Sequence, residues 1–327
     1  MTRILVIKLA ALGDMVQAFA PLARIRAAHP EAEITLLTTP PYAALAAASP
    51  YVDRVESDGR SGKLADTLAM LWRLRRARYD RVYDLQTSSR SSAYFYALWP
   101  RPPEWSGIAW AASHPHANPK RDFMHTLERQ ADQLGFAGIW PDAPIAPGTA
   151  PPPDLSWMLA DPSPERQPAH FGLGERFALL IPGASAHRPG KRWPATRYGE
   201  LAAWLVQRGL DVGVIGGALE AEAARTILAA APSARDLTTR TDFTQIAALG
   251  ARAALAVGND TGPTHLVAAA GAPTLVLFSA ESDPALCAPR GRLTQILQSP
   301  RLDDLSAAAV ETAAETLLNV PAPASTP

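Results

Sequence analysis

The chain has one cysteine, no apolar stretch of the ~20 residues that a bilayer-spanning helix needs, and no net charge. Because Cys287 is the only cysteine among 327 residues, an internal disulfide is excluded and a reducing compartment is favoured. The 31 basic and 31 acidic residues cancel, which argues against general nucleic-acid binding. The start, Met1-Thr2-Arg3 and then Ile4-Leu5-Val6-Ile7, lacks the apolar length and cleavage site of a signal peptide. We therefore expect a cytoplasmic protein.

The first apolar run also lacks the glycine pattern of a dinucleotide site. It continues into Ala10-Ala11-Leu12-Gly13-Asp14-Met15, where only Gly13 is present instead of G-x-G-x-x-G. A nicotinamide-dependent dehydrogenase is therefore disfavoured. The turn places the carboxylate of Asp14 after the first predicted strand, where open α/β sheets keep their reactive groups. Asp14 is a candidate general base, and capping of the following helix is the alternative.

Short apolar runs alternate with helical patterns through nearly the whole chain, which predicts parallel sheets with crossover helices. The predicted strands are Arg3–Leu9, Glu33–Thr38, Val52–Glu56, Arg81–Leu85, Trp105–Ile108, Phe177–Ile181, Asp211–Ile215, Ala253–Val257 and Thr274–Phe278. The predicted helices are Asp14–Ala28, Tyr42–Ala48, Leu64–Ala77, Ser91–Leu98, Phe123–Leu134, a helix from Pro194 to Gly209, and Asp304–Leu318.

The length predicts two domains, and a proline-dense stretch indicates where they meet. Eight prolines fall between Pro141 and Pro164, a composition that is typical of a linker. We expect a first α/β domain over 1–150, a linker over 151–170, a second α/β domain over 171–318 and a disordered tail over 319–327. The last helix, 304–318, is a candidate to pack back on the first domain. Two such domains facing across a cleft would place a ligand between them.

The most informative motif is Asn259-Asp260-Thr261-Gly262-Pro263-Thr264-His265, between an apolar strand run and a small-residue helix. Free N–H groups at the start of such a helix, with its dipole, attract an anion such as a phosphate. Asp260 cannot hold a phosphate and is better suited to hydroxyl groups beside one. This combination describes a nucleotide sugar. His265 could touch the ligand, or simply pack or cap the helix.

Two further strand ends carry candidate donor-binding residues. Ser185 and Lys191 follow the strand that ends at Ile181, and they could give a phosphate a hydroxyl donor and a point charge. Glu220 follows Gly216-Gly217 after the next strand and could accept both hydroxyls of a ribose. The alternatives are a solvated loop lysine for Lys191 and a helix cap for Glu220.

The charges are distributed unevenly along the chain. Ten basic residues against five acidic ones lie between Arg54 and Arg101. This segment predicts either a solvated helix face or a surface for an anionic acceptor or anionic lipid headgroups. Arg60, Lys63, Lys120 and Arg121 are candidates for binding the acceptor's phosphate or carboxylate groups, and ordinary surface roles are the alternative.

The histidines give no metal-binding pattern. His114-x-His116 is the closest pair, and it lies in a proline-bearing loop where we expect no nearby carboxylate. We therefore predict neither a metal site nor a cofactor.

Several segments together resemble family 9 glycosyltransferases, the heptosyltransferases of lipopolysaccharide core assembly. The matching segments are Ile4–Pro21, Tyr79–Ser92, Leu180–Pro194, Val214–Glu220, Gly258–Ala269 and Thr274–Pro284. The resemblance implies a GT-B fold, in which two Rossmann-like domains face across a cleft. It also implies an inverting, metal-independent transfer of a sugar, most simply heptose from ADP-heptose, to an anionic glycolipid acceptor. Peripheral contact with the inner-membrane surface is a further expectation.

The resemblance also implies a role for each matching residue. Asp14 falls on the proposed general base, Asp260 on the ligand of the sugar hydroxyls, and the backbone near Thr241 where the adenine is seated. The remaining donor positions are Ser185 and Lys191 for the pyrophosphate, Glu220 for the ribose, Thr261 and Gly262 for the phosphate cradle, and His265 beside it. Two alternatives stay open, a nucleotide-sugar epimerase of the same fold and a non-catalytic nucleotide-sugar-binding protein in envelope assembly.

Overall fold

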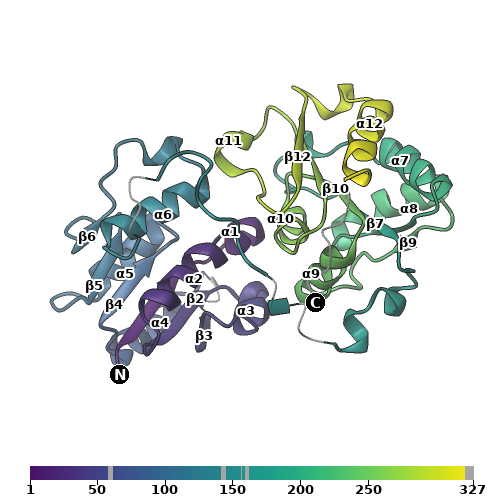
Figure 1. Cartoon of the computed structure of the whole chain (residues 1–327). Coiled ribbons are helices and arrows are strands. Elements are labelled where there is room, and N and C mark those ends of the chain that lie inside the picture. The colour runs from purple at the N-terminus through teal and green to yellow at the C-terminus, as the bar shows by residue number, and fades with distance from the viewer. Residues whose placement is uncertain (58–61, 141–144, 156, 159–161, 321–327) are drawn as a thin grey trace. The chain divides into compact units, whose positions relative to one another are not determined.

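A computed structural model describes residues 1–57, 62–140, 145–155, 157–158 and 162–320 of the chain (Figure 1). The contacts divide the chain into two compact units, Met1–Pro153 and Asp154–Pro327. No helix in the described ranges is both long and apolar enough to cross a membrane.

The first unit is built on a six-stranded sheet in which all pairings are parallel. Its strands follow the order β3-β2-β1-β4-β5-β6. The strands are β1 (Arg3–Ile7), β2 (Glu33–Thr38), β3 (Arg54–Ser57), β4 (Arg81–Asp84), β5 (Glu104–Gly107) and β6 (His114–Pro115). The helices are α1 (Leu12–Gln17), α2 (Phe19–Ala28), α3 (Pro40–Ala47), α4 (Leu64–Ala77), α5 (Ser89–Ala97) and α6 (Thr126–Phe136).

The second unit repeats this design with a sheet of order β12-β11-β10-β7-β8-β9, again parallel throughout. Its strands are β7 (Phe177–Ile181), β8 (Asp211–Val214), β9 (Arg235–Asp236), β10 (Leu255–Asn259), β11 (Thr274–Phe278) and β12 (Thr294–Gln298). Its helices are α7 (Ala195–Gln207), α8 (Ala221–Ala230), α9 (Phe243–Arg252), α10 (Gly262–Ala269), α11 (Pro284–Cys287) and α12 (Ala307–Leu318). At the end of the proline-rich stretch and just after it, 164–166 and 168–171 form short 3-10 turns.

In each sheet the strand order reverses once, at a topological switch point, and open α/β sheets bind ligands at such a point. The first sheet winds outward from β1 through β2 and β3, and the chain then returns to β4 on the other side. The second sheet does the same between β7 and β10. At such a point the loops after two neighbouring strands diverge and leave a crevice at the carboxyl edge.

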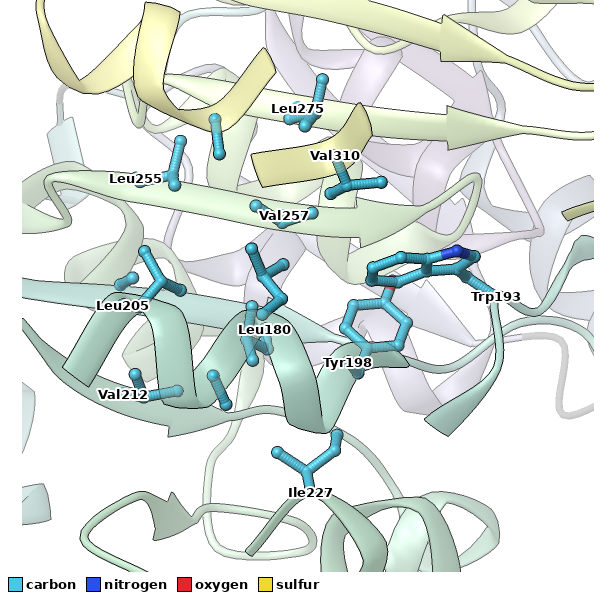
Figure 2. Packing of buried hydrophobic residues seen from close by; sticks show 14 of the residues in the cluster. Leu180, Trp193, Tyr198, Leu205, Val212, Ile227, Leu255, Val257, Leu275 and Val310 are labelled. Atoms are coloured by element: carbon cyan, nitrogen blue, oxygen red, sulfur yellow. The ribbon is translucent and has the colours of Figure 1, made fainter. Parts of the chain in front are cut away.

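A large core cluster of the second unit joins its sheet to helices α7, α8 and α12 (Figure 2). The indole of Trp193 meets the ring of Tyr198 edge-on, with centroids 4.8 Å apart. Val310 of α12 belongs to the same buried cluster as Leu255 and Val257 of β10. The last helix therefore packs within the second unit, against α7 and strands β10 to β12.

The sequence predicted the central elements closely and the edges poorly. Strands β2, β7 and β11 and helix α4 have the predicted bounds. One predicted helix, Asp14–Ala28, is divided into α1 and α2 around Ala18. Strands β6, β9 and β12 were not predicted, because short edge strands with polar residues lack a continuous apolar run.

Candidate active site

Asn259, the last residue of β10, joins the two strands at the winding change of the second sheet. Its side chain is fully buried, and its Nδ2 donates to the carbonyls of Pro182 at 2.8 Å and Gly183 at 3.2 Å. Its Oδ1 accepts from the backbone N–H of Trp193 at 3.2 Å and from the hydroxyl of Tyr198 at 3.1 Å. One amide thereby fixes the loop after β7 and the entry to α7 against the tip of β10.

The next residue, Asp260, is held in a buried ionic cluster. Its Oδ2 lies 2.5 Å from Nζ of Lys191, and its Oδ1 lies 3.6 Å from Nε2 of His265. The three side chains are 7%, 11% and 8% exposed, respectively. Burial opposes the charge on Asp260, but the hydrogen bonds from His265 and Lys191 outweigh it and hold its pKa well below the usual range. Asp260 is therefore ionised at neutral pH, with the Lys191 ammonium on one side and the His265 imidazole on the other.

Helix α10 begins directly after this cluster. Thr261 is its N-cap residue in an extended conformation, without a side-chain cap bond, and Gly262 is the first helical residue. The N–H of a first-turn residue has no acceptor inside its own helix, and Pro263 has no N–H. Both Thr261 and Gly262 are partly exposed, and they directly follow Asp260 in the sequence.

Glu220 lies against the glycine turns that end β7 and β8. Its Oε2 accepts from the N–H of Gly217 at 2.8 Å, which is the helix-capping contact that the sequence left as an alternative. A Cβ added at Gly216 would approach the Glu220 Cβ to 2.5 Å, and one at Gly183 would come within 3.0 Å of the Glu220 side chain. The Glu220 side chain leaves no room for a Cβ at Gly216 and little room for one at Gly183.

The remaining donor candidates lie nearby in the sequence or at the same sheet edge. Ser185 is exposed and precedes Lys191 in one loop, where its carbonyl accepts from the N–H of Arg188. Thr241 follows β9, and its Oγ1 is buried with no hydrogen-bond partner within the described ranges. The structure thus joins Lys191, Asp260 and His265 directly, and it places the other candidates in loops at the carboxyl ends of their strands.

In the first unit, Asp14 lies in the first turn of α1, just after β1. Its Oδ2 accepts from the N–H of Ala11 at 3.1 Å, so the capping alternative describes one of its contacts. Its Oδ1 lies 3.6 Å from Nζ of Lys8, whose side chain is 4% exposed, whereas the Asp14 side chain is 42% exposed. Burial lowers the pKa of Lys8, and the Asp14 carboxylate opposes that shift. An accessible carboxylate thus pairs with a buried lysine. The sequence reasoning did not identify Lys8 as the partner of Asp14.

Strand β4 lies beside β1, on the other side of the point where the strand order of the first sheet reverses. Gln86 Oε1 accepts from the N–H groups of Leu9 at 2.8 Å and Ala10 at 3.3 Å, so it fixes the loop that carries Asp14. Asp84 is fully buried, and its Oδ1 accepts from the N–H groups of Gln86 and Thr87. Burial raises the pKa of Asp84 to about 6.

The four candidates for acceptor binding differ in their exposure and in their contacts. Lys63 caps α4 and Lys120 lies in an exposed turn, both on the surface. Arg121 pairs with Asp122 at 2.8 Å, yet its Nε is buried and has no partner in the described part of the chain. Arg60 lies outside the described residues.

Arg129 of α6 is a basic residue that the sequence reasoning did not single out. It is half-buried, and its guanidinium has no hydrogen-bond or ion-pair partner among the residues that the structure describes. Burial and then the neighbouring charge of Arg121 lower its pKa, and Asp14 raises it. Arg129 therefore lies close enough to both residues to feel their charge. The sequence does not reveal this proximity, because Arg129 of α6 is far from Asp14 along the chain.

The histidine pair differs from the expectation in one respect. His116 Nε2 lies 2.8 Å from Asp132 Oδ2 and His114 Nε2 lies 3.7 Å from Glu104 Oε2, so the expectation of no nearby carboxylate was wrong. Each histidine pairs with a different carboxylate because α6 and β5 pack beside β6. No cluster of three or more potential metal ligands occurs over the described ranges.

Comparisons with known proteins identify the family of the chain. The model of glycosyltransferase family 9 (heptosyltransferase) matches residues 67–313. Lipopolysaccharide heptosyltransferase 2 of Salmonella typhimurium is 27% identical over 305 residues, which cover 86% of this chain and 83% of that protein. The protein of the same name from Escherichia coli K12 is 28% identical over 299 residues, with the same coverage.

Solved structures give the fold. The E. coli ADP-heptose lipopolysaccharide heptosyltransferase II has a TM-score of 0.80 at 26% identity, over 97% of this chain and 98% of that one. A family 9 glycosyl transferase from Veillonella parvula has a TM-score of 0.82 at 21% identity, over 97% of both chains. The two parallel-sheet units are thus the two Rossmann-like domains of a GT-B fold. The chain belongs to glycosyltransferase family 9, the heptosyltransferase family.

Proposed function

We propose that this glycosyltransferase moves a heptose from ADP-heptose to an acceptor of the lipopolysaccharide core, with inversion at the anomeric carbon and without a metal ion. Two relatives named lipopolysaccharide heptosyltransferase 2 support the acceptor class. A solved heptosyltransferase named for ADP-heptose supports the donor. The observation that carries the proposal is the cluster of Lys191, Asp260 and His265 at the start of α10.

In this proposal the second unit binds the donor. Lys191, the hydroxyl of Ser185 and the N–H groups of Thr261 and Gly262 bind the diphosphate. As the bond from the anomeric carbon to the diphosphate oxygen breaks, negative charge grows on the departing ADP. A lysine and helix N–H groups that are already in place stabilise that charge without reorganisation. This supply of positive charge removes the need for a cation.

The carboxylates of the second unit recognise hydroxyl groups. Asp260, ionised and held from both sides, accepts hydrogen bonds from the sugar hydroxyls, and His265 fixes its orientation. Glu220, between the glycine turns of β7 and β8, accepts from the ribose hydroxyls. The segment at Thr241, with an unpartnered Oγ1, contacts the adenine.

The first unit binds the acceptor and supplies the base. The attacking acceptor hydroxyl forms the new bond to the anomeric carbon and gives its proton to Asp14, which is exposed enough to receive it. A single displacement of this kind inverts the anomeric centre. Arg121 and Arg129, each with unused donors, bind an anionic group of the acceptor, and Arg60, Lys63 and Lys120 contribute at the surface. The protein acts in the cytoplasm, in peripheral contact with the inner membrane.

The test is the substitution Asp14→Ala assayed with ADP-heptose and a core acceptor. We expect kcat to fall by roughly 10²–10⁴-fold, the usual contribution of a general base, while calorimetric binding of ADP stays unchanged. Turnover close to that of the wild type would refute the role of Asp14. ADP release from the donor without any acceptor, with isomerised sugar as product, would instead indicate an epimerase. Binding of ADP-heptose without transfer to any core acceptor would indicate a binding protein.

A further inference from the structure

Helix α4 of the first unit is apolar on the side that faces away from the core. Met70 and Leu74 are buried against the sheet, 2% and 3% exposed. Leu64, Leu68 and Trp72 follow one another at intervals of four residues and are 73%, 56% and 61% exposed. These three side chains form a stripe about 12 Å long on one helix face. A surface helix ordinarily carries polar residues there, so the stripe needs an apolar partner.

Arginines surround the carboxyl end of this stripe. A shallow depression is lined by Trp72, Arg75, Arg76 and Arg78. The guanidinium of Arg76 lies 5.3 Å from the centre of the Trp72 ring, and Arg75 donates to the carbonyl of Trp99 at 3.2 Å. Trp99 is itself 52% exposed, so a second indole lies in the segment that Arg75 holds.

Acidic residues are scarce on this helix. Within α4, whose residues are all described, Asp66 is the single acid against Arg73, Arg75 and Arg76. Arg73 is engaged by Glu56, which lies 3.3 Å away. The charge of Arg75 and Arg76, with that of Arg78 beyond the helix, therefore has no acidic counterpart on the helix face that bears Leu68 and Trp72.

We propose that this face of α4 docks on an anionic lipid bilayer, with Leu64, Leu68 and Trp72 in the headgroup–acyl boundary and Arg75, Arg76 and Arg78 on lipid phosphates. Leucine and tryptophan on one face with arginine beside them is the composition of an interfacial helix. Tryptophan favours the interfacial layer because its ring is apolar and its N–H is polar. Arginine keeps its charge in the headgroup region while its aliphatic stem covers apolar surface.

The topology gives this docking a purpose, which rests on the proposed function. All strands of the first sheet are parallel, so a helix that connects β3 to β4 starts at the carboxyl edge and runs back. The Leu64 end of α4 therefore lies toward the edge that carries Asp14. A helix lying flat on the membrane would bring that edge to the bilayer surface, where a glycolipid acceptor presents its headgroup.

The test is co-sedimentation of the full chain with vesicles of phosphatidylethanolamine and phosphatidylglycerol, compared with vesicles of phosphatidylcholine alone. We expect binding to the anionic vesicles that weakens as salt is raised, because surface charges are screened beyond about 10 Å at 0.1 M. The double variant Arg76→Gln/Arg78→Gln should bind roughly 25-fold more weakly, since each basic residue near an anionic surface contributes about fivefold. The variant Leu68→Ser/Trp72→Ser should lose binding.

A matched control exists in the second unit. Arg208 lies over the ring of Trp204, at the same four-residue spacing as Arg76 and Trp72, but Trp204 is partly buried on α7. The variant Arg208→Gln/Arg225→Gln removes the same charge and should bind anionic vesicles as the wild type does. Thermal unfolding of every variant shows whether it is folded.

Three outcomes would overturn the proposal. The first is that the wild type does not bind anionic vesicles, and the second is that the α4 variants bind them as well as the wild type does. The third is a reversible dimer in ultracentrifugation that Leu68→Ser/Trp72→Ser abolishes, in a protein that does not bind vesicles. Calorimetric ADP binding and transfer to a lipid-free core fragment should be unchanged in the α4 variants. Failure of those two measurements in the wild type would refute the proposed function, whereas the vesicle result tests α4 alone.

Discussion

Removal of Lys191 should reveal how strongly the buried cluster at α10 is coupled. In Lys191→Met the Asp260 carboxylate, 7% exposed, loses a cation 2.5 Å away and keeps only His265 at 3.6 Å. Breaking one side of a buried ion pair costs about 3–5 kcal/mol. Because His265 remains, we expect the lower end, about 3 kcal/mol, which corresponds to a fall in Tm of roughly 9 °C for a domain of this size.

The companion variant is Asp260→Asn. It leaves Lys191 without its carboxylate, but Lys191 belongs to a loop whose neighbours Pro189 and Gly190 are exposed, so its ammonium can reach water. We expect a cost of about 1 kcal/mol for this variant, and a double variant that costs about 2 kcal/mol less than the sum of the two. Calorimetry of the full chain measures all three. Additive costs, or an unchanged Tm in Lys191→Met, would refute the account of the cluster.

The pH dependence gives an independent check of the same cluster. The folded-state pKa of Asp260 lies well below its unfolded value of about 3.9, so its stabilising charge is fully present above that pH. The contribution is lost as the pH falls from about 4 toward the folded pKa. The Tm difference between the wild type and Asp260→Asn should therefore stay constant from about pH 8 to 5 and shrink below about pH 4.

Three further predictions concern Lys8, Asn259 and Asp84, which lie at or near the carboxyl ends of the central strands. In Lys8→Met the fold should persist, because a buried charge is removed, but kcat should fall roughly tenfold, since Asp14 loses its supporting cation. Lys8→Arg should restore part of that activity, and an unchanged kcat in Lys8→Met would count against the pairing. Asn259→Ala should cost about 3 kcal/mol in urea unfolding because it leaves four buried hydrogen bonds unmade, whereas a loss under about 0.5 kcal/mol would contradict the amide clamp. Asp84 has a folded pKa of about 6, so its stabilisation is complete below about pH 4 and is lost as the pH rises through 6. Asp84→Asn lacks this loss, so its stability relative to the wild type should rise from about pH 4 to pH 7, and a flat difference would show that Asp84 does not titrate there.

The sequence alone determined the α/β class, the alternation of elements and the glycine and carboxylate residues at the strand ends. Apolar runs such as Phe177–Ile181 are recognisable because a strand buried on both faces must be apolar throughout. The motif that begins at Asn259 is likewise local, since a strand end, a turn and a helix start lie within a few residues. The short edge strands escaped prediction because they are neither long nor continuously apolar.

The tertiary structure decided which of these residues act together. Lys191 meets Asp260 across 69 positions of sequence, and Lys8 was invisible as the partner of Asp14 because nothing local distinguishes it from a surface lysine. On α4 the sequence left a solvated helix face and a surface for anions as alternatives, and the exposure of Leu68 and Trp72 became visible only in the structure. A local pattern predicts the type of a single helix or strand. The ion pairs and the exposure of side chains depend on which elements the strand order places side by side.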